Sequence, residues 1–316
     1  MMPLLKIVPQ NTSLPFLRFH KVGLAFSAVL VLVSIAAWIG IGLNTGIDFR
    51  GGFLVEVRSK SGPADIQGLR DELESLNLGD ISLQEFGVDT DVMIRVQSQS
   101  LEDSESLTDR DKAALRQITT SIDDEYIIRR TEFVGAVVGG ELRKKAMYAV
   151  IAALGAILIY IWFRFEWPFA VAAIVALSHD VISTIGLFSL TGFEFNLSTV
   201  AALLTIAGYS INDTVVVFDR VRDNLRKYKS HEIPDILNRS LNETLARTVM
   251  TSVTTLLALF SIFFFGGAVL ADFALAMIWG VVIGTYSSIF VAVATLTWFD
   301  LKPQDEDDTP VPEYER

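Results

Sequence analysis

Residues 167–190 read WPFAVAAIVALSHDVISTIGLFSL, an apolar run whose only acidic residue is Asp180. A helix of about 20 such residues crosses the hydrocarbon core of a bilayer, which is about 30 Å thick. Five further runs of this kind are predicted as spans, at residues 22–43, 146–163, 197–218, 248–266 and 272–299. The sequence therefore predicts a polytopic membrane protein with six transmembrane helices.

The charged residues gather between the first two predicted spans. Hydrophobic residues make up 51% of the 316 residues and charged residues 20%, yet residues 44–145 hold 33 of the 63 charges. We therefore predict one large soluble insert, and a single soluble globule is excluded. The absence of cysteine excludes disulfides and thiolate sites. The absence of a Gly-Lys-Ser/Thr phosphate loop excludes a P-loop nucleotide site.

Lysine and arginine in short loops predict the orientation, because cytoplasmic loops carry an excess of them. The connection at 219–247 holds seven, whereas the loops at 191–196 and 267–271 hold none. We therefore expect the N-terminal segment 1–21, the basic connection and the acidic tail 300–316 in the cytoplasm, and the insert outside. The basic connection also suits contact with anionic lipid. A signal peptide is the alternative for the first run, which is longer than the roughly 7–15 residues of a signal-peptide core.

The insert shows two kinds of apolar periodicity. Alternation predicts strands at residues 53–58, 81–86, 92–97 and 126–131. A helical period predicts amphipathic helices at 64–76 and 109–121, with a solvated linker at 98–107. The resulting order, βαββαβ, is that of a ferredoxin-like domain. Nothing in the insert resembles a catalytic or metal-binding constellation.

Asp213 lies well inside the fourth apolar run, beside Asn212. Charged groups within a span are energetically costly and are commonly functional. One interpretation is a structural carboxyl, neutralised by burial or paired with Arg220, which lies seven residues further on. The other is a carrier of protons or ions, and this is the interpretation we favour.

Other polar residues in the spans allow two interpretations each. His179 and Asp180, in the middle of the third run, fit either a structural hydrogen-bonded pair or part of a proton path. Arg247 precedes a hydroxyl-rich face in the fifth run, and its side chain could also extend to the cytoplasmic interface. A stripe of small residues at spacing four in the sixth run predicts close helix packing, and it consists of Gly280, Gly284 and Ser288.

Several motifs together resemble the SecD/SecF family. Gly46-Ile47-Asp48-Phe49-Arg50-Gly51-Gly52 is similar to the family signature G-x-D-F-x-G-G. Residues 133–139 also match, although Ala136 stands where SecF proteins often have proline. Further matches are at residues 163–167, 179–180, 208–224, 247–248 and 284–288. The resemblance covers residues 20–300, and the short insert is typical of the SecF branch rather than of SecD or a fused SecDF.

The resemblance implies a subunit of the bacterial inner membrane that is not an enzyme and needs no cofactor. It would pair with SecD, dock on the SecYEG channel and use the proton gradient to promote export of preproteins, with YajC and YidC as further partners and no nucleic acid. The family belongs to the resistance-nodulation-division (RND) superfamily. Asp213 would be the protonatable carboxylate and Arg247 its partner, with His179, Asp180 and Asn212 as further relay candidates. Gly46, Asp48, Phe49, Gly51, Gly52 and Arg220 would be family motif residues.

Two rival functions remain open at this level. The first is one half of an RND-type exporter of small molecules or ions, which would be expected to have twelve spans and larger outer loops in one chain. The second is a non-conducting membrane scaffold, whose polar residues only hold helices together. A scaffold would tolerate replacement of Asp213 by asparagine, and a proton carrier would not.

Overall fold

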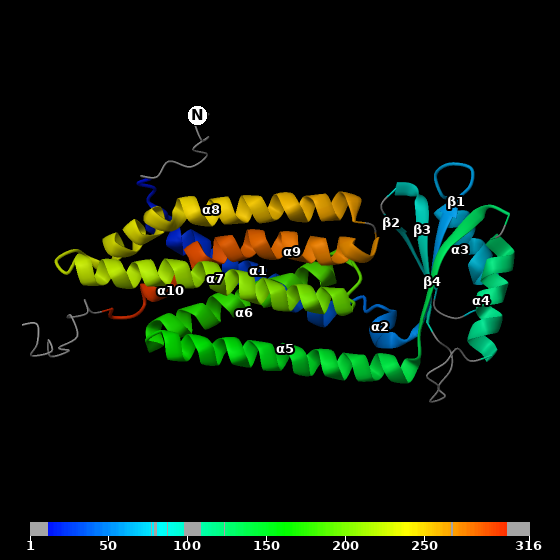
Figure 1. The fold of residues 1–316 in the computed structure, drawn as a ribbon, viewed down its shortest axis with the longest axis horizontal. Coiled ribbons are helices and arrows are strands. Elements are labelled where there is room, and N and C mark those ends of the chain that lie inside the picture. Colours follow the sequence, from blue (N-terminus) through cyan, green and yellow to red (C-terminus); the bar gives the residue numbers. More distant parts are fainter. Residues whose placement is uncertain are drawn as a thin grey trace, which may run out of the picture.

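The computed structural model describes residues 12–76, 78, 81–86, 88–97, 109–122, 124–266 and 268–301. Figure 1 shows an elongated molecule, with long helices side by side at one end and a small sheet with two helices at the other. The predicted linker at 98–107 and most of the acidic tail lie outside the described residues.

Among the described residues, six helices are long and apolar enough to cross a membrane, as predicted. They are α1 (His20–Gly40), α5 (Ala136–Arg164), α6 (Trp167–Thr191), α7 (Leu197–Lys227), α8 (Ile233–Phe265) and α9 (Ala268–Ser287). A short 3-10 turn, η1 (Phe16–Phe19), precedes α1, and α9 continues through a π turn, η2 (Ser288–Ala292), into α10 (Val293–Leu296). We call these six helices with η2 and α10 the bundle.

Three helices extend beyond the predicted spans. Helix α5 begins at Ala136, whereas the predicted span begins at residue 146, so its first turns lie in the segment predicted as the insert. Helix α7 continues to Lys227 and α8 begins at Ile233, so the predicted connection at 219–247 is mostly helix with a short turn. Hydropathy detects only the part of a helix that suits lipid, whereas backbone hydrogen bonding continues into polar sequence.

Helices α6, α7 and α9 form the buried centre of the bundle, and α5 and α8 lie at its periphery. Close approaches set the packing of the central helices. A Cβ atom on Gly186 of α6 would lie 2.1 Å from the Ser34 hydroxyl of α1, so these helices touch through backbone. The Phe218 ring packs edge to face on the rings of Phe165 and Phe169, and the three close the end of the bundle that is remote from the sheet.

The segment between α1 and α5 forms a four-stranded antiparallel sheet with two long helices. In chain order the elements are α2 (Ile47–Arg50), β1 (Gly52–Ser59), α3 (Ile66–Ser75), β2 (Ile81–Phe86), β3 (Val88–Gln97), α4 (Asp109–Ile122) and β4 (Tyr126–Val134). The strands are arranged β2-β3-β1-β4. We call β1–β4 with α3 and α4 the inserted domain, and the end of the bundle next to it the domain end.

Both faces of this sheet are covered. Helices α3 and α4 pack on one face, where Val55, Val57, Val92 and Ile94 are fully buried. The opposite face meets α2 and the domain end of the bundle, through Leu54 and Met93 (Figure 1). Alternation along β3 therefore places Arg95 on the bundle side of the sheet, where it is only 8% exposed.

Candidate functional site in the membrane helices

Asp213 is a buried carboxylate at the junction of three elements. It lies on α7, and its two oxygens accept hydrogen bonds from two other elements. Thr248 of α8 donates to Oδ1 at 2.5 Å, and Ser288 of η2 donates to Oδ2 at 2.5 Å. The sequence identified Asp213 but did not predict that Thr248 and Ser288 bond to it, because hydroxyl side chains are common in membrane helices.

Asp180 forms a second buried carboxylate site close to the first. Its Oδ1 lies 2.9 Å from His179 Nδ1, and its Oδ2 accepts hydrogen bonds from Ser210 of α7 and Ser287 of α9. His179 and Asp180 are adjacent on one helix, and in the described residues the cross-helix hydrogen bonds of this pair come from the two serines. The neighbouring residues Ser287 and Ser288 therefore donate to different carboxylates and link the two sites.

The imidazole of His179 has one free nitrogen. Within the described part of the chain, the buried Nε2 atom has no hydrogen-bond partner. The side chain lines an apolar cavity of about 590 Å³ between α1 and α6. His179 is thus placed to hold Asp180 through one ring nitrogen, while the other nitrogen stays unpaired.

Asn212 and Arg247 lie beside this site but on the exposed surface of the bundle. Arg247 is close enough to attract the Asp213 carboxylate, yet in the described residues it forms no ion pair with it. Arg247 directly precedes Thr248, which donates a hydrogen bond to Asp213, so Arg247 and Asp213 lie at a similar level along the bundle. An exposed charge beside an apolar helix surface is costly in lipid, and a neighbouring protein surface would lower that cost.

In the described residues Asp213 and Arg220 do not form the pair that the sequence offered as an alternative. Arg220 donates instead to Glu243 of α8 at 2.7 Å, and Asn224 donates to the same carboxylate at 2.8 Å. The reason is that α7 continues past the predicted span and packs there against the extended start of α8. Arg220 therefore joins two helices away from the Asp213 site.

The small-residue stripe of α9 faces α7. A Cβ atom on Gly280 would lie 2.2 Å from Ile206, and one on Gly284 would lie 3.2 Å from Ser210. The third member of the stripe, Ser288, is the residue that donates to Asp213. Close packing of α9 on α7 therefore brings Ser288 within reach of the carboxylate.

Ser288 is also the first residue of the π turn η2. A π turn contains one more residue than an α turn and frequently occurs at functional sites. Here it separates α9, which carries the glycine stripe, from the final turn α10, which is buried. The irregularity therefore occurs where α9 supplies its hydroxyls to the two carboxylates.

The residues of the Gly46–Gly52 motif form the joint between the inserted domain and the bundle. Gly51 has φ of 75°, which favours glycine, and Phe49 is buried beside the Phe195 ring. Asp48 accepts a hydrogen bond from the backbone N–H of Leu197 at 2.9 Å and so caps α7. These residues, with Gly52 at the start of β1, lie away from Asp213 and Asp180.

The site contains carboxylates, hydroxyls and one imidazole. In the described residues there is no group of three or more His, Cys, Asp or Glu side chains that could hold a metal ion. A carboxyl surrounded by hydroxyls can exist in either protonation state, because a hydroxyl both donates and accepts hydrogen bonds. Binding and release of a proton is therefore the chemistry that these groups support.

Comparison with protein families gives one match over most of the bundle. Residues 114–302 match the family "Protein export membrane protein SecD/SecF, C-terminal". The chain is 46% identical over 294 residues to the protein translocase subunit SecF of Cereibacter sphaeroides, covering 91% of this chain and 90% of that protein. It is 43% identical over 296 residues to the subunit of the same name from Rickettsia felis, covering 93% and 94%.

Solved structures show the same similarity in three dimensions. The crystal structure of SecDF from Thermus thermophilus, described as a translocon-associated membrane protein, matches with a TM-score of 0.81 at 36% identity. The match covers 92% of this chain and 39% of that one. A SecDF structure in a super-membrane-facing form matches with a TM-score of 0.63, covering 94% and 40%. The chain thus spans well under half the length of these SecDF proteins.

Proposed function

The chain belongs to the SecD/SecF family of protein-export membrane proteins, and from this membership we propose that proton movement through its Asp213 site drives protein translocation. It is a multi-pass protein of the bacterial inner membrane with the role of a SecF-type translocase subunit. The proton role of individual residues is the part that we propose here.

The observation that carries this proposal is the set of ligands around Asp213. Two hydroxyls from α8 and η2 hold the carboxylate, and a cation, Arg247, lies nearby without forming an ion pair with Asp213 in the described part of the chain. If Arg247 moved towards Asp213, the ionised carboxylate would be favoured, and if it moved away, proton uptake would be favoured. This alternation is what a proton-driven switch requires.

The available energy is sufficient for such a switch. One proton crossing a membrane potential of about 150 mV releases about 3.5 kcal/mol. That energy changes a two-state equilibrium by a factor of a few hundred. The Asp180 group would respond to the same event, because a backbone shift that moves Ser288 would also move the neighbouring Ser287, which donates to Asp180.

SecD is the partner that would cover the exposed face with Asn212 and Arg247. The SecDF chain matched by this protein is more than twice as long, so the remaining helices would come from a second subunit. We further propose contact with the SecYEG channel, and with YajC and YidC, in the assembled translocase. The inserted domain would be a ferredoxin-like domain outside the cytoplasm, with both chain termini inside.

Exchange of Asp213 provides the decisive test. We expect D213N to lose the stimulation of translocation by a proton gradient, because asparagine keeps the shape but cannot titrate. D213E should retain part of the stimulation, and R247M should lose it through loss of the counter-charge. The measurement is translocation of a secreted protein into vesicles at constant ATP, with the gradient present or collapsed.

A matched control is available on the same helix. Asp223 is exposed on α7, so D223N should behave like the unmodified chain. Association of each variant with SecD, measured by copurification, separates loss of function from loss of assembly. If D213N gains as much from the gradient as the unmodified chain does, Asp213 is structural and the scaffold function is correct.

A further inference from the structure

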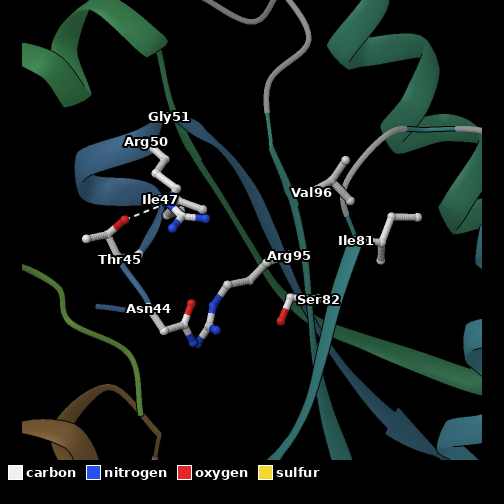
Figure 2. Close-up of a pocket in the computed structure, with 10 residues that line it drawn as sticks. Asn44, Thr45, Ile47, Arg50, Gly51, Ile81, Ser82, Arg95 and Val96 are labelled. Atoms are coloured by element: carbon white, nitrogen blue, oxygen red, sulfur yellow. Dashed lines mark hydrogen bonds between the residues drawn. The ribbon is translucent and has the colours of Figure 1, made fainter. Parts of the chain in front are cut away.

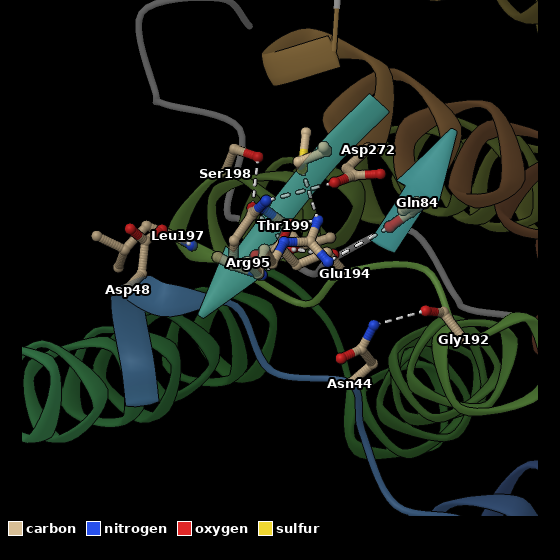
Figure 3. A network of polar contacts seen from close by, with 12 residues as sticks. Asn44, Asp48, Gln84, Arg95, Gly192, Glu194, Leu197, Ser198, Thr199 and Asp272 are labelled. Atoms are coloured by element: carbon tan, nitrogen blue, oxygen red, sulfur yellow. Dashed lines mark hydrogen bonds and ion pairs between the residues drawn. The ribbon is translucent and has the colours of Figure 1, made fainter. Parts of the chain in front are cut away.

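A buried ion pair joins the inserted domain to the bundle. Arg95 reaches from β3 towards the domain end, where one Nη atom pairs with Glu194 (Figure 3). The other contacts of its guanidinium are within the sheet, to Met93 Sδ at 3.0 Å and to Gln84 Oε1 at 3.4 Å. Arg95 is thus the charged link between the sheet and the membrane helices in the described part of this interface.

The acidic side of this link lies where two central helices begin. Glu194 is in the short connection between α6 and α7, three residues before α7 starts at Leu197. Asp272 lies near the start of α9 and attracts the same arginine. Asn196, the N-cap of α7, lies 3.4 Å from Asp272 through its amide nitrogen and so connects the two helix starts (Figure 3).

The same two helices carry the buried site further along, in the middle of α7 and at the end of α9. Helix α7 holds Ser210 and Asp213, and α9 with η2 holds Ser287 and Ser288. The distance along α7 from its start to Asp213 is about 24 Å, from a rise of about 1.5 Å per residue. A packed helix is a rigid element that can carry a displacement over such a distance, so a shift at the site would reach the starts of α7 and α9 near Glu194 and Asp272.

The conformation around Glu194 is tightly fitted. A Cβ atom on Gly46 would lie 2.1 Å from Glu194 Oε1, so only glycine leaves room for the carboxylate at this position. The cap of α7 by Asp48 comes from the same joint. Movement of the start of α7 therefore cannot occur without displacing either the joint or the carboxylate that Arg95 holds.

The Arg95–Glu194 ion pair contributes little to stability, which favours a role in fixing the relative position of the sheet and the helices. Burial raises the pKa of Glu194 to about 7, even though Arg95 opposes that shift, while Asp272 and Asp48 reinforce it. Burial also lowers the pKa of Arg95. Desolvation therefore exceeds the attraction between the two charges, as is common for buried pairs, which in some proteins serve structural specificity.

Space for movement exists beside the arginine. A cavity of about 280 Å³ adjoins Arg95, and Asn44, Thr45, Arg50 and Ser82 are among the residues that line it (Figure 2). The Nε atom of Arg95 has no hydrogen-bond partner in the described part of the chain. The guanidinium therefore has both a free donor and room to reorient.

We propose that Arg95 is a positioning residue that couples the inserted domain to the proton site by clamping the starts of α7 and α9 through Glu194 and Asp272. This inference rests on the proposed proton function of Asp213. When the hydrogen bonds around Asp213 change, the shift of α7 against α9 reaches the clamp, and the inserted domain changes its position relative to the bundle.

The test measures the position of the domain rather than transport. The chain has no cysteine, so cysteines introduced at the exposed residues Ser61 and Thr191 can carry two spin labels uniquely. The distance distribution between the labels is recorded in the full chain, copurified with SecD and placed in lipid nanodiscs. Four labelled proteins are compared: the chain without further changes, D213N, R95M, and the double variant D213N/R95M.

We expect D213N to shift the distance distribution when Arg95 is present and to leave it unchanged in the R95M background. R95K should restore part of the response, because it keeps the charge but loses the forked geometry. R58M is the matched control, since Arg58 pairs with Asp91 in the same sheet. It should leave the response to D213N intact.

Two results would overturn the clamp. One is a response to D213N that persists in R95M, and the other is the absence of any response in the otherwise unmodified chain. If R95M fails to fold, the single variants R95K and E194Q replace it in the comparison. A response to D213N that is undiminished in both of these backgrounds overturns the proposal. Failure of the proposed proton function gives a different result. In that case D213N would show normal gradient-dependent translocation, which the distance measurement does not report.

Discussion

At the scale of single residues, the two buried carboxylates of the bundle are held by hydroxyls. Thr248 and Ser288 donate to Asp213, while Ser210 and Ser287 donate to Asp180. A bonded cation would hold a carboxylate in its ionised form, whereas a hydroxyl can serve the neutral and the ionised form alike. This ligand type leaves the charge of the site to be set by groups that move.

Glu194 gives a pH prediction for stability. Its pKa is about 7 in the folded protein, raised by burial from 4.5, so between these values the folded state binds more protons than the unfolded state. Its contribution to the unfolding free energy therefore falls as pH rises through this window, by up to about 1.4 kcal/mol per pH unit, and then levels off. We expect E194Q, which cannot titrate, to gain thermal stability relative to the unmodified chain between about pH 5 and pH 8.

The measurement is the melting temperature of the purified chain in detergent, compared at each pH. E141Q serves as the control, because Glu141 is an exposed glutamate on α5. A difference between E194Q and the unmodified chain that does not change with pH would contradict this prediction.

Sequence reasoning found the charged residues of the site but not their surroundings. Asp213 and Arg247 stand out because charges are rare in apolar runs. Ser210 and Ser287 do not, since serine is ordinary in a membrane helix, although each lies within the motif segments that resemble the SecD/SecF family. Arg95 gave no signal at all, because an arginine at an alternate position of a half-exposed strand is common.

At the scale of elements, local periodicity predicted the strands, because apolar residues alternate along them. The strand predicted at 81–86 agrees with β2, and the other three are longer in the structure than predicted. Helix ends were predicted less well, because α5, α7 and α8 continue beyond the lipid-facing sequence. Their extensions are set by contacts such as Arg220–Glu243, which join residues distant in sequence.

The contact between α9 and α7 gives a prediction about packing. We expect G280A to destabilise the chain by about 1–3 kcal/mol, because the new methyl group would overlap the buried Ile206 side chain. G155A is the matched control on α5, where a Cβ atom would meet nothing within 4 Å. It should be neutral or slightly stabilising, since alanine favours a helix.

Thermal unfolding in detergent measures both variants, and translocation activity can be followed in the same preparations. G280A should also reduce gradient-dependent translocation, because Ser288 lies on the displaced helix. Equal melting temperatures for the two variants would show that α9 does not pack on α7 through Gly280.

At the scale of the whole molecule, the arrangement of the inserted domain against the bundle could not be predicted from sequence patterns. The patterns account for the sheet face that packs on α3 and α4, where apolar residues alternate. The opposite face is buried by α2 and by the connection with Glu194, and these contacts join residues far apart in the chain. Long-range docking of this kind has no local periodicity.

Labelling of cysteines tests the predicted topology. We expect Ser61→Cys, in the inserted domain, to react with a membrane-impermeant maleimide in cells with a permeabilised outer membrane. Ser230→Cys, in the turn between α7 and α8, should react only after the inner membrane is opened. Both positions are exposed, and the chain has no other cysteine to react. Labelling of position 230 but not of position 61, in cells whose inner membrane is still closed, would reverse the orientation.

The π turn η2 has a consequence for how the chain tolerates changes of length. Successive residues of an α-helix are rotated by about 100°, and a π turn holds one residue more than an α turn. For nearly the same rotation, the π turn therefore contains one additional residue. Deleting one residue from 289–292 would restore a regular helix and leave α10 close to its present phase relative to the glycine stripe. The buried side chains of Val293 and Leu296 would then keep their present packing. The same deletion within the regular part of α9 would instead rotate everything beyond it by about 100°.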